Sequence, residues 1–189
     1  MEKMITKDVL VGKSVILKPC TEEFVTQDYV DWMNKTEVNQ YLETRYVEQT
    51  FDMVKDYVLH NINAENEMLL AIISKEDGVH VGNLHLTFVQ RHKRCIFAYA
   101  IGKEEYWGHG IMSEAISLAT RWVFENFDVA RLDAGLYARN KGSLRALEKA
   151  GWKKEAVCRS FFLLNDGTRD DEILVGILRE DFEEIYNGK

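Results

Sequence analysis

The first third of the chain combines one strand pattern with several helix patterns. Residues 14–18 are a short, mainly apolar stretch ended by Pro19, which predicts a strand. Apolar residues then recur at helical spacing, which predicts helices over about 22–33, from Thr36 through Leu42, and over 51–61. Thr36 belongs to the residue types that commonly cap a helix start. A strand followed by helices is therefore expected.

The pattern becomes strand-like at Met68. Residues 68–73 form an apolar run, 81–89 partly alternate, and 95–101 supply a third run. The turn Lys75-Glu76-Asp77-Gly78 and a polar turn at 90–94 separate these runs as hairpin turns would. Three neighbouring antiparallel strands are predicted.

A long amphipathic helix and another strand follow. The helix extends to about Phe127, and its apolar face carries Ile111, Ala115, Leu118, Ala119 and Trp122. Residues 131–138 form the next strand. A strand, a helix and a strand in succession predict a parallel strand pair.

The last part of the chain predicts a short helix and a hairpin. The helix covers about 141–149, and Gly151 is a suitable residue just beyond its end. Strands over about 154–164 and 172–178 flank the turn Asn165-Asp166-Gly167. The sum is a mixed α/β sheet with helices.

Composition favours one soluble domain over residues 1–189. The hydrophobic fraction of 46% suffices for a continuous core, and neither a repeat nor a Pro/Gly-rich linker divides the chain. The net charge of −7, with both signs interspersed, argues against an extended nucleic-acid groove, so an anionic ligand must be met locally. Cys20, Cys95 and Cys158 have no paired spacing, so we expect reduced cysteines and no metal site.

We expect a cytoplasmic protein that does not enter the membrane. Residues 1–8 lack the apolar run of a secretory signal, and no stretch of the chain is apolar for long enough to cross a bilayer.

The stretch Trp107-Gly108-His109-Gly110-Ile111-Met112 joins a predicted strand to the long helix. Two glycines allow a tight turn whose N–H groups face one anion, and the positive end of the helix favours that charge. His109 could add a donor. The same pattern also fits an ordinary glycine-rich turn between strand and helix. The chain contains neither a G-x-x-x-x-G-K-[ST] loop nor a complete G-x-G-x-x-G fingerprint here.

From about Ser14 to Phe182 the chain resembles the GNAT acetyltransferase superfamily, in particular the branch of the ribosomal-protein N-terminal alanine acetyltransferases. The acetyl-CoA motif of that family, Arg/Gln-x-x-Gly-x-Gly/Ala, aligns with the residues from Trp107 to Met112. Trp107 stands where Arg or Gln is usual, and Met112 stands where a small residue is usual. A second family signature, N-x-x-S-x-x-x-x-x-K-x-G-[FW], matches the residues from Asn140 to Trp152.

The resemblance implies a fold and a set of cofactor contacts. It implies a GNAT-like, largely antiparallel central sheet of about seven strands with a splayed parallel pair, flanked by helices. Acetyl-CoA would bind as cosubstrate without a metal, with its pantetheine arm on the backbone of Ala100 and Ile101 and beside Asn140 and Ser143. Asn140 and Ser143 also fit a plain helix-capping role.

The implied reaction is direct transfer of acetyl to a primary amine. By resemblance, Ser143 would protonate the thiolate leaving group, and Tyr99 is the second candidate, although it also fits a core aromatic residue. The sequence offers no firm general base. Glu43, Arg45 and His85 are candidate acceptor contacts, and Glu43 and His85 equally fit solvated or structural roles.

The sequence does not identify the acceptor amine or the oligomeric state. A protein N-terminus, an amino sugar and another small amine such as a polyamine all fit, and so do a monomer and a homodimer. The alternatives in function are a catalytically silent acetyl-CoA sensor or scaffold and an enzyme for another phosphate-bearing ligand.

Overall fold

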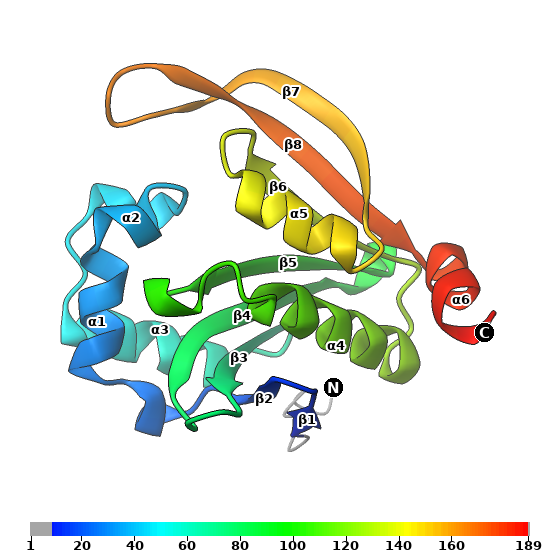
Figure 1. The fold of residues 1–189 in the computed structure, drawn as a ribbon, viewed down its shortest axis with the longest axis horizontal. Helices are drawn as coiled ribbons and strands as arrows, with labels where there is room; N and C mark the ends of the chain where they lie inside the picture. Colours follow the sequence, from blue (N-terminus) through cyan, green and yellow to red (C-terminus); the bar gives the residue numbers. More distant parts are fainter. Residues whose placement is uncertain (1–8, 189) are drawn as a thin grey trace.

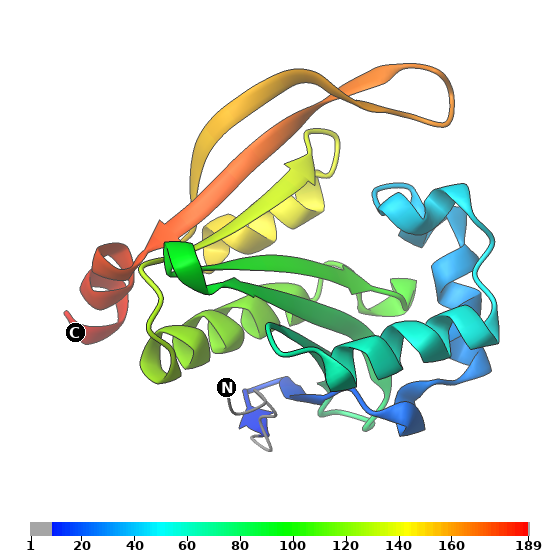
Figure 2. The same ribbon diagram turned by 180° about the vertical axis from the view of Figure 1, so that it is seen from behind.

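The computed structural model describes residues 9–188 as one mixed sheet with helices on both faces (Figures 1 and 2). The order of the eight strands is β1-β2-β3-β4-β5-β6-β8-β7, and every neighbouring pair is antiparallel except β5 and β6. This confirms the expected mixed sheet with one parallel pair, with eight strands where about seven were expected. The prediction that residues 1–8 carry no secretory signal concerns residues outside the described part.

The strands are β1 (Leu10–Val11), β2 (Val15–Pro19), β3 (Glu67–Ser74), β4 (His80–Val89), β5 (Arg94–Ile101), β6 (Arg131–Tyr137), β7 (Lys153–Leu163) and β8 (Arg169–Leu178). The α-helices are α1 (Gln27–Asn34), α2 (Thr36–Asn39), α3 (Phe51–Asn63), α4 (Ile111–Asn126), α5 (Lys141–Lys149) and α6 (Arg179–Asn187).

The N-terminal helices differ from the sequence prediction in their boundaries. The helix expected over 22–33 is divided into a short 3-10 helix, Glu22–Phe24, and α1. The division falls at Thr26, whose backbone is extended and therefore interrupts the helix. The Thr26 hydroxyl caps α1 by accepting a hydrogen bond from the Tyr29 N–H at 3.2 Å. Thr36 is the first residue of α2 rather than its cap, and no side chain caps that helix.

Among the described strands and α-helices, β1 and α6 were not predicted. The strand β1 has only two residues, and α6 begins directly where β8 ends. The strand pattern of β8 runs up to Leu178, whose N–H donates to the Asp181 carboxylate at 3.1 Å and so starts the helix without a turn between them. A change of period without an intervening loop is hard to detect from sequence.

The core lies on both faces of the sheet. Along β3, Met68, Leu70 and Ile72 pack in the larger cluster with α4, α5 and α6, whereas Leu69, Ala71 and Ile73 pack in a second cluster with α1 and α3. This division follows from the alternation of side chains along a strand. It explains why β3 is an unbroken apolar run.

The parallel strands β5 and β6 separate soon after they meet. Their ladder contains three residue pairs, and the last of them joins Ile96 to Asp133. Beyond it, β5 continues to Ile101 while β6 stays paired with β8 as far as Tyr137. Figure 1 shows the two strands diverging toward α2, with the starts of α4 and α5 at the same end. We call this opening the splay; it leaves two strand edges without a ladder partner.

Candidate functional site

A cavity of about 450 Å³ opens at the splay between the ends of α2 and β5 and the starts of α4 and α5. It brings together Tyr99, a predicted catalytic residue, and most of the residues predicted to hold the cofactor. These lining residues are Tyr99, Ala100, Ile101, Trp107, Gly108, Gly110, Ile111, Met112, Asn140 and Ser143. The exposed His109 belongs to the same turn but is not among the residues that line the cavity.

The backbone of β5 presents an open edge to this cavity. The Gly102 N–H donates to the Val81 carbonyl at 2.9 Å, on the β4 side. Because hydrogen-bonding directions alternate along a strand, the backbone groups of Ala100 also face β4, while those of Tyr99 and Ile101 face the splay. Ile101 can therefore offer backbone contacts to a ligand in the splay, whereas Ala100 can offer only its side chain.

The turn before α4 is built for close approach of an anion. Gly108 and Gly110 have φ values of 79° and 82°, which a residue with a side chain adopts only with strain. A β-carbon at either position would meet no atom within 4 Å, so the turn faces open space. Gly110 is the N-cap of α4 and provides no capping side chain, whereas Thr50 and Asn140 cap α3 and α5. The first N–H groups of α4 are thus left for a ligand.

Trp107 ties this turn to the end of β5. Its indole N–H donates to the Ile101 carbonyl at 3.0 Å, and 41% of its surface is exposed at the cavity. The Ile101 carbonyl, which faces the splay, is therefore hydrogen-bonded to Trp107, whereas the Ile101 N–H still faces the opening. Trp107 thus holds the glycine turn against the strand edge.

Asn140 and Ser143 stand at the start of α5 and meet Tyr99 of β5. The Asn140 Oδ1 accepts from the Ser143 N–H at 3.1 Å, so the capping role is present and the amide NH₂ remains for a ligand. The Ser143 hydroxyl lies 2.7 Å from the Tyr99 hydroxyl. Burial raises the pKa of Tyr99 well above its ordinary value, and the bond to Ser143 lowers it by less. Tyr99 is therefore a neutral proton donor at physiological pH.

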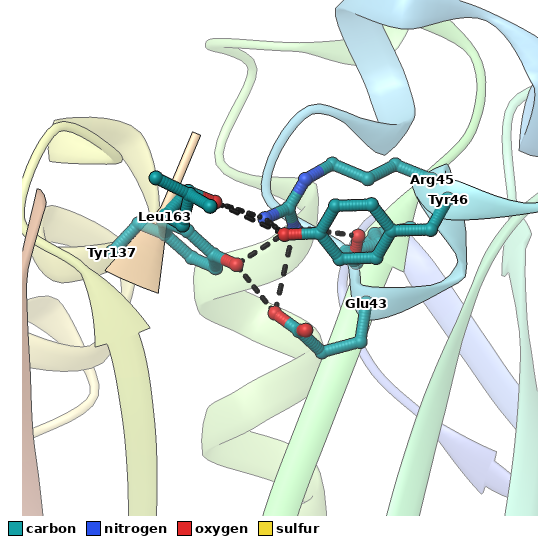
Figure 3. A network of polar contacts seen from close by, with 6 residues as sticks. Glu43, Arg45, Tyr46, Tyr137 and Leu163 are labelled. Atoms are coloured by element: carbon teal, nitrogen blue, oxygen red, sulfur yellow. Dashed lines mark hydrogen bonds and ion pairs between the residues drawn. The ribbon is translucent and has the colours of Figure 1, made fainter. Parts of the chain in front are cut away.

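The predicted acceptor residues Glu43 and Arg45 lie on a 3-10 helix, Glu43–Tyr46, across the splay from β6 (Figure 3). The Arg45 guanidinium donates to the Tyr137 hydroxyl at 2.7 Å and to the Leu163 carbonyl at 3.0 Å. Tyr137 in turn donates to the Glu43 carboxylate. These contacts tie the 3-10 helix to β6 and to the end of β7.

Glu43 and Arg45 differ in what they leave for a substrate. The Arg45 side chain is 1% exposed, and both of its terminal nitrogens bond protein oxygens. Glu43 lies 3.4 Å from Arg45 and keeps 68% of its side chain exposed. Burial and the bond to Glu43 raise the pKa of Tyr137 to about 12. Arg45 is thus a clamp between segments, and Glu43 is the exposed charge that it holds in place.

His85 lies away from the cavity lining. Alternation along β4 turns it from the α4 face, where Leu84 and Leu86 pack, toward α3. There its Nε2 is 3.4 Å from a Glu67 oxygen, in a geometry too poor for a hydrogen bond, and its ring centroid is 6.1 Å from that of Tyr57. Burial, the largest effect, lowers the pKa of His85 below its ordinary value, against the raising effect of Glu67.

The cavity also contains residues that the sequence reasoning missed. Arg145 and Lys149 line it from α5, and Glu37 lines it from α2. The first two are four residues apart on one helix face, a spacing that could have indicated a cationic wall for an anionic ligand. Tyr137 was missed because its neighbours in space come from distant parts of the chain.

The cysteines Cys20, Cys95 and Cys158 are free thiols. Among the described residues there is no group of three or more potential metal ligands, and no described helix is long and apolar enough to span a bilayer.

Comparison with known sequences gives a family match and a close relative. The model of the Acetyltransferase (GNAT) domain matches residues 14–153. The probable N-acetyltransferase YjcK of Bacillus subtilis is 31% identical over 125 residues, which are 65% of this chain and 68% of that protein.

Two solved structures with coenzyme A share the fold. The ribosomal L7/L12 alpha-N-protein acetyltransferase RimL, in complex with coenzyme A, superposes with a TM-score of 0.81 at 18% identity, covering 90% of this chain and 98% of that one. The spermidine N-acetyltransferase of Vibrio cholerae, in complex with CoA and spermine, has a TM-score of 0.79 at 17% identity, covering 90% and 99%.

Proposed function

The chain belongs to the GNAT acetyltransferase family and is an N-acetyltransferase, and we propose that it transfers acetyl directly from acetyl-CoA to a primary amine. One observation carries the proposal: the open edge of β5 and the uncapped start of α4 meet in a single cavity. An elongated ligand with a phosphate group at one end and amides along its arm would satisfy both.

The residues of the cavity fit acetyl-CoA. The N–H groups at the start of α4 would hold the diphosphate, and Arg145 and Lys149 would add positive charge beside it. The backbone of Tyr99 and Ile101 and the amide of Asn140 would pair with the pantetheine arm. His109, exposed at the turn, would act on the phosphates only from the outside.

Acetyl-CoA supplies an activated thioester carbonyl, and the protein must orient the amine, stabilise negative charge and move protons. A backbone N–H of β5 at the splay would donate to the developing oxyanion, a contribution worth about 10²–10³ in rate in other enzymes. Ser143, backed by the neutral Tyr99, would give its proton to the departing sulfur. No covalent attachment to the protein is needed.

The acceptor side of the site favours a cationic amine. The exposed carboxylate of Glu43 would attract the ammonium form of the acceptor, and Arg45 and Tyr137 would hold that carboxylate in place. RimL by its name acts on a protein N-terminus, and the enzyme from Vibrio cholerae by its name acts on spermidine. We propose an acceptor of this kind, and we place the reaction in the cytoplasm, where the three free thiols would stay reduced.

The proposal is tested with a panel of amines. Purified protein is mixed with acetyl-CoA and an alanine-terminated peptide, spermidine or an amino sugar, and the release of CoA thiol and the acetylated product are measured. We expect release that depends on the acceptor. Tight binding of CoA without acceptor-dependent release would instead support a sensor or scaffold, and thermal protection by nucleotides alone would support an enzyme for another phosphate ligand.

A further inference from the structure

Glu172 of β8 lies on the acceptor face of the sheet, beside the splay. In β6 and β8, Leu136 and Ile173 pack under α4 and α5, so their neighbours Tyr137 and Glu172 project from the opposite face. Tyr137 and Glu172 are directly paired in the ladder. Tyr137 contacts Tyr41, a residue of the cavity lining, with ring centroids 5.5 Å apart. Glu172 therefore shares a face with one wall of the acceptor side.

The Glu172 side chain leans over β6 toward β5. A β-carbon on Gly135 of β6 would collide with the Glu172 carboxylate oxygen and would lie 3.3 Å from its Cδ. Because β6 lies between β8 and β5, a side chain that crosses Gly135 points toward the splay. Gly135 is two residues beyond Asp133, the last residue of β6 paired with β5, so the carboxylate lies where the strands begin to separate.

In the described part of the chain, no protein group neutralises the Glu172 carboxylate. Glu172 is only partly exposed, and within residues 9–188 it makes no hydrogen bond or ion pair. Half-buried carboxylates are normally paired, because burial without a partner disfavours their charged form. Glu172 does not line the cavity, but an unpaired carboxylate on the sheet face beside the splay is a candidate for proton transfer.

We propose that Glu172 is the general base that deprotonates the acceptor amine, an inference that rests on the proposed function. An N–H bond of the acceptor ammonium breaks, its electron pair stays on nitrogen, and the proton forms an O–H bond with the Glu172 carboxylate before passing to water. The neutral amine then attacks the thioester carbon, and the C–S electron pair leaves with sulfur. After the attack, the nitrogen loses a second proton, which passes to the Ser143 oxygen and replaces the proton that Ser143 gives to sulfur.

The surroundings of Glu172 suit this role. Burial raises the pKa of Glu172 above that of an ordinary glutamate, toward the range in which a carboxylate accepts protons efficiently. The titratable and charged groups on this face also include Tyr137, Asp133 and Arg131 of β6, Asp170 of β8, Cys158 and Glu155 of β7, and Glu43 across the splay. Tyr137 is neutral, because burial and the bond to Glu43 raise its pKa to about 12. Asp133 is paired with Arg94 and Arg131, Glu155 is paired with Arg131, and Asp170 accepts from the Arg139 N–H.

The experiment combines two variants and a matched control. Glu172→Gln removes the base, and Gly135→Ala pushes the carboxylate away from the splay while leaving it in the protein. Glu155→Gln is the control, because Glu155 of β7 likewise lies over a glycine but is paired with Arg131: a β-carbon on Gly176 would lie 2.7 Å from Glu155 Oε1. CoA affinity and carboxyl titration by ¹³C NMR of the free protein are measured beside the pH profile of kcat/KM.

We expect Glu172→Gln to lower kcat/KM by about 100-fold, to abolish the rise of kcat/KM through the Glu172 pKa, and to leave CoA affinity within twofold. Gly135→Ala should lower the rate and shift the same carboxyl resonance, and the double variant should be no slower than Glu172→Gln alone. Glu155→Gln should keep the wild-type profile.

Two results would overturn the inference, and they are distinguishable. If the wild type acetylates an amine and Glu172→Gln retains its rate and pH profile, Glu172 is not the base while the proposed function stands. If the wild type binds CoA but acetylates no amine, the proposed function fails and the role of Glu172 falls with it.

Discussion

The hydroxyl groups of Tyr99 and Ser143 lie 2.7 Å apart, although 44 residues separate them in sequence. One comes from the free edge of β5 and the other from the first turn of α5, and both residues line the cavity. The pair therefore depends on the splay and on the cap that Asn140 gives to α5.

The Tyr99 and Ser143 pair should act as one proton-donating unit. We expect Ser143→Ala and Tyr99→Phe each to lower kcat by about 10–100-fold, since each breaks the same path to the sulfur. The double variant should lose little more than either single one. Steady-state kinetics and CoA titration measure this, and fully additive losses with unchanged CoA affinity would show that the two hydroxyls act separately.

The glycine turn before α4 should not tolerate negative charge. Gly110→Glu should weaken CoA binding by at least about tenfold, because the carboxylate would lie at the phosphate position. Gly110→Ala shares the strain of a positive φ without the charge. Gly78→Glu is the second control, since Gly78 also has a positive φ of 72° and open space but lies in the turn between β3 and β4. Equal CoA affinity of Gly110→Glu and the wild type, by calorimetry, would refute this docking.

The Arg45 clamp should support both stability and acceptor binding. Arg45→Met should lower the free energy of unfolding by about 2 kcal/mol, because the Tyr137 hydroxyl loses its donor and the Leu163 carbonyl keeps only the Tyr46 hydroxyl. Arg45→Lys should recover little, since an ammonium cannot make the forked contacts. We expect a higher KM for the amine and an unchanged Kd for CoA.

A control for the Arg45 clamp comes from an exposed pair. Lys35 lies 3.8 Å from Glu104 with half of its side chain exposed, so Lys35→Met should change the free energy of unfolding by less than about 0.5 kcal/mol. Urea unfolding of the variants decides between the two cases. Equal effects of Arg45→Met and Lys35→Met would contradict the clamp.

Stability should fall in mild acid because of two partly buried histidines, His80 and His85. His80 packs among Phe24, Tyr29 and Trp32, and burial lowers its pKa in the folded protein although its bond to Asn83 opposes this. Below about pH 6.5 the unfolded chain binds a proton that the folded chain does not, so the free energy of unfolding decreases as pH falls. The lowered pKa of His85 contributes with the same sign.

Urea unfolding between pH 7.5 and 5 measures this dependence. We expect His80→Phe to have a shallower decrease than the wild type, and His92→Gln, at an exposed position, to keep the wild-type slope. An unchanged slope in His80→Phe would show that His80 does not carry the effect.

Local chemistry made much of this molecule predictable from sequence. The alternation around His85, the apolar run at Leu69 and the turn at Gly78 each depend on a few neighbouring residues, and the corresponding strands and hairpin are present. The turn at Gly108 and Gly110 was predicted for the same reason, because a glycine pair before an amphipathic helix has few physical explanations.

The acceptor side was not predictable in the same way. Arg45 looked like an exposed ligand because its partner Leu163 is 118 residues away and nothing local indicates their contact. The position of Glu172 beside the splay follows only from its pairing with Tyr137 and from Gly135 on the neighbouring strand, which has no side chain to block it. Glycine within an apolar strand was the one local signal of such a close approach.

The most direct test of the account is a crystal structure of the protein with bound CoA. We predict that the diphosphate accepts hydrogen bonds from backbone N–H groups between Gly108 and Met112, and that the pantetheine arm lies in the splay against Tyr99 and Ile101. CoA bound outside the splay, or a turn at Gly110 closed under packed side chains, would contradict the assignment of this cavity as the acetyl-CoA site.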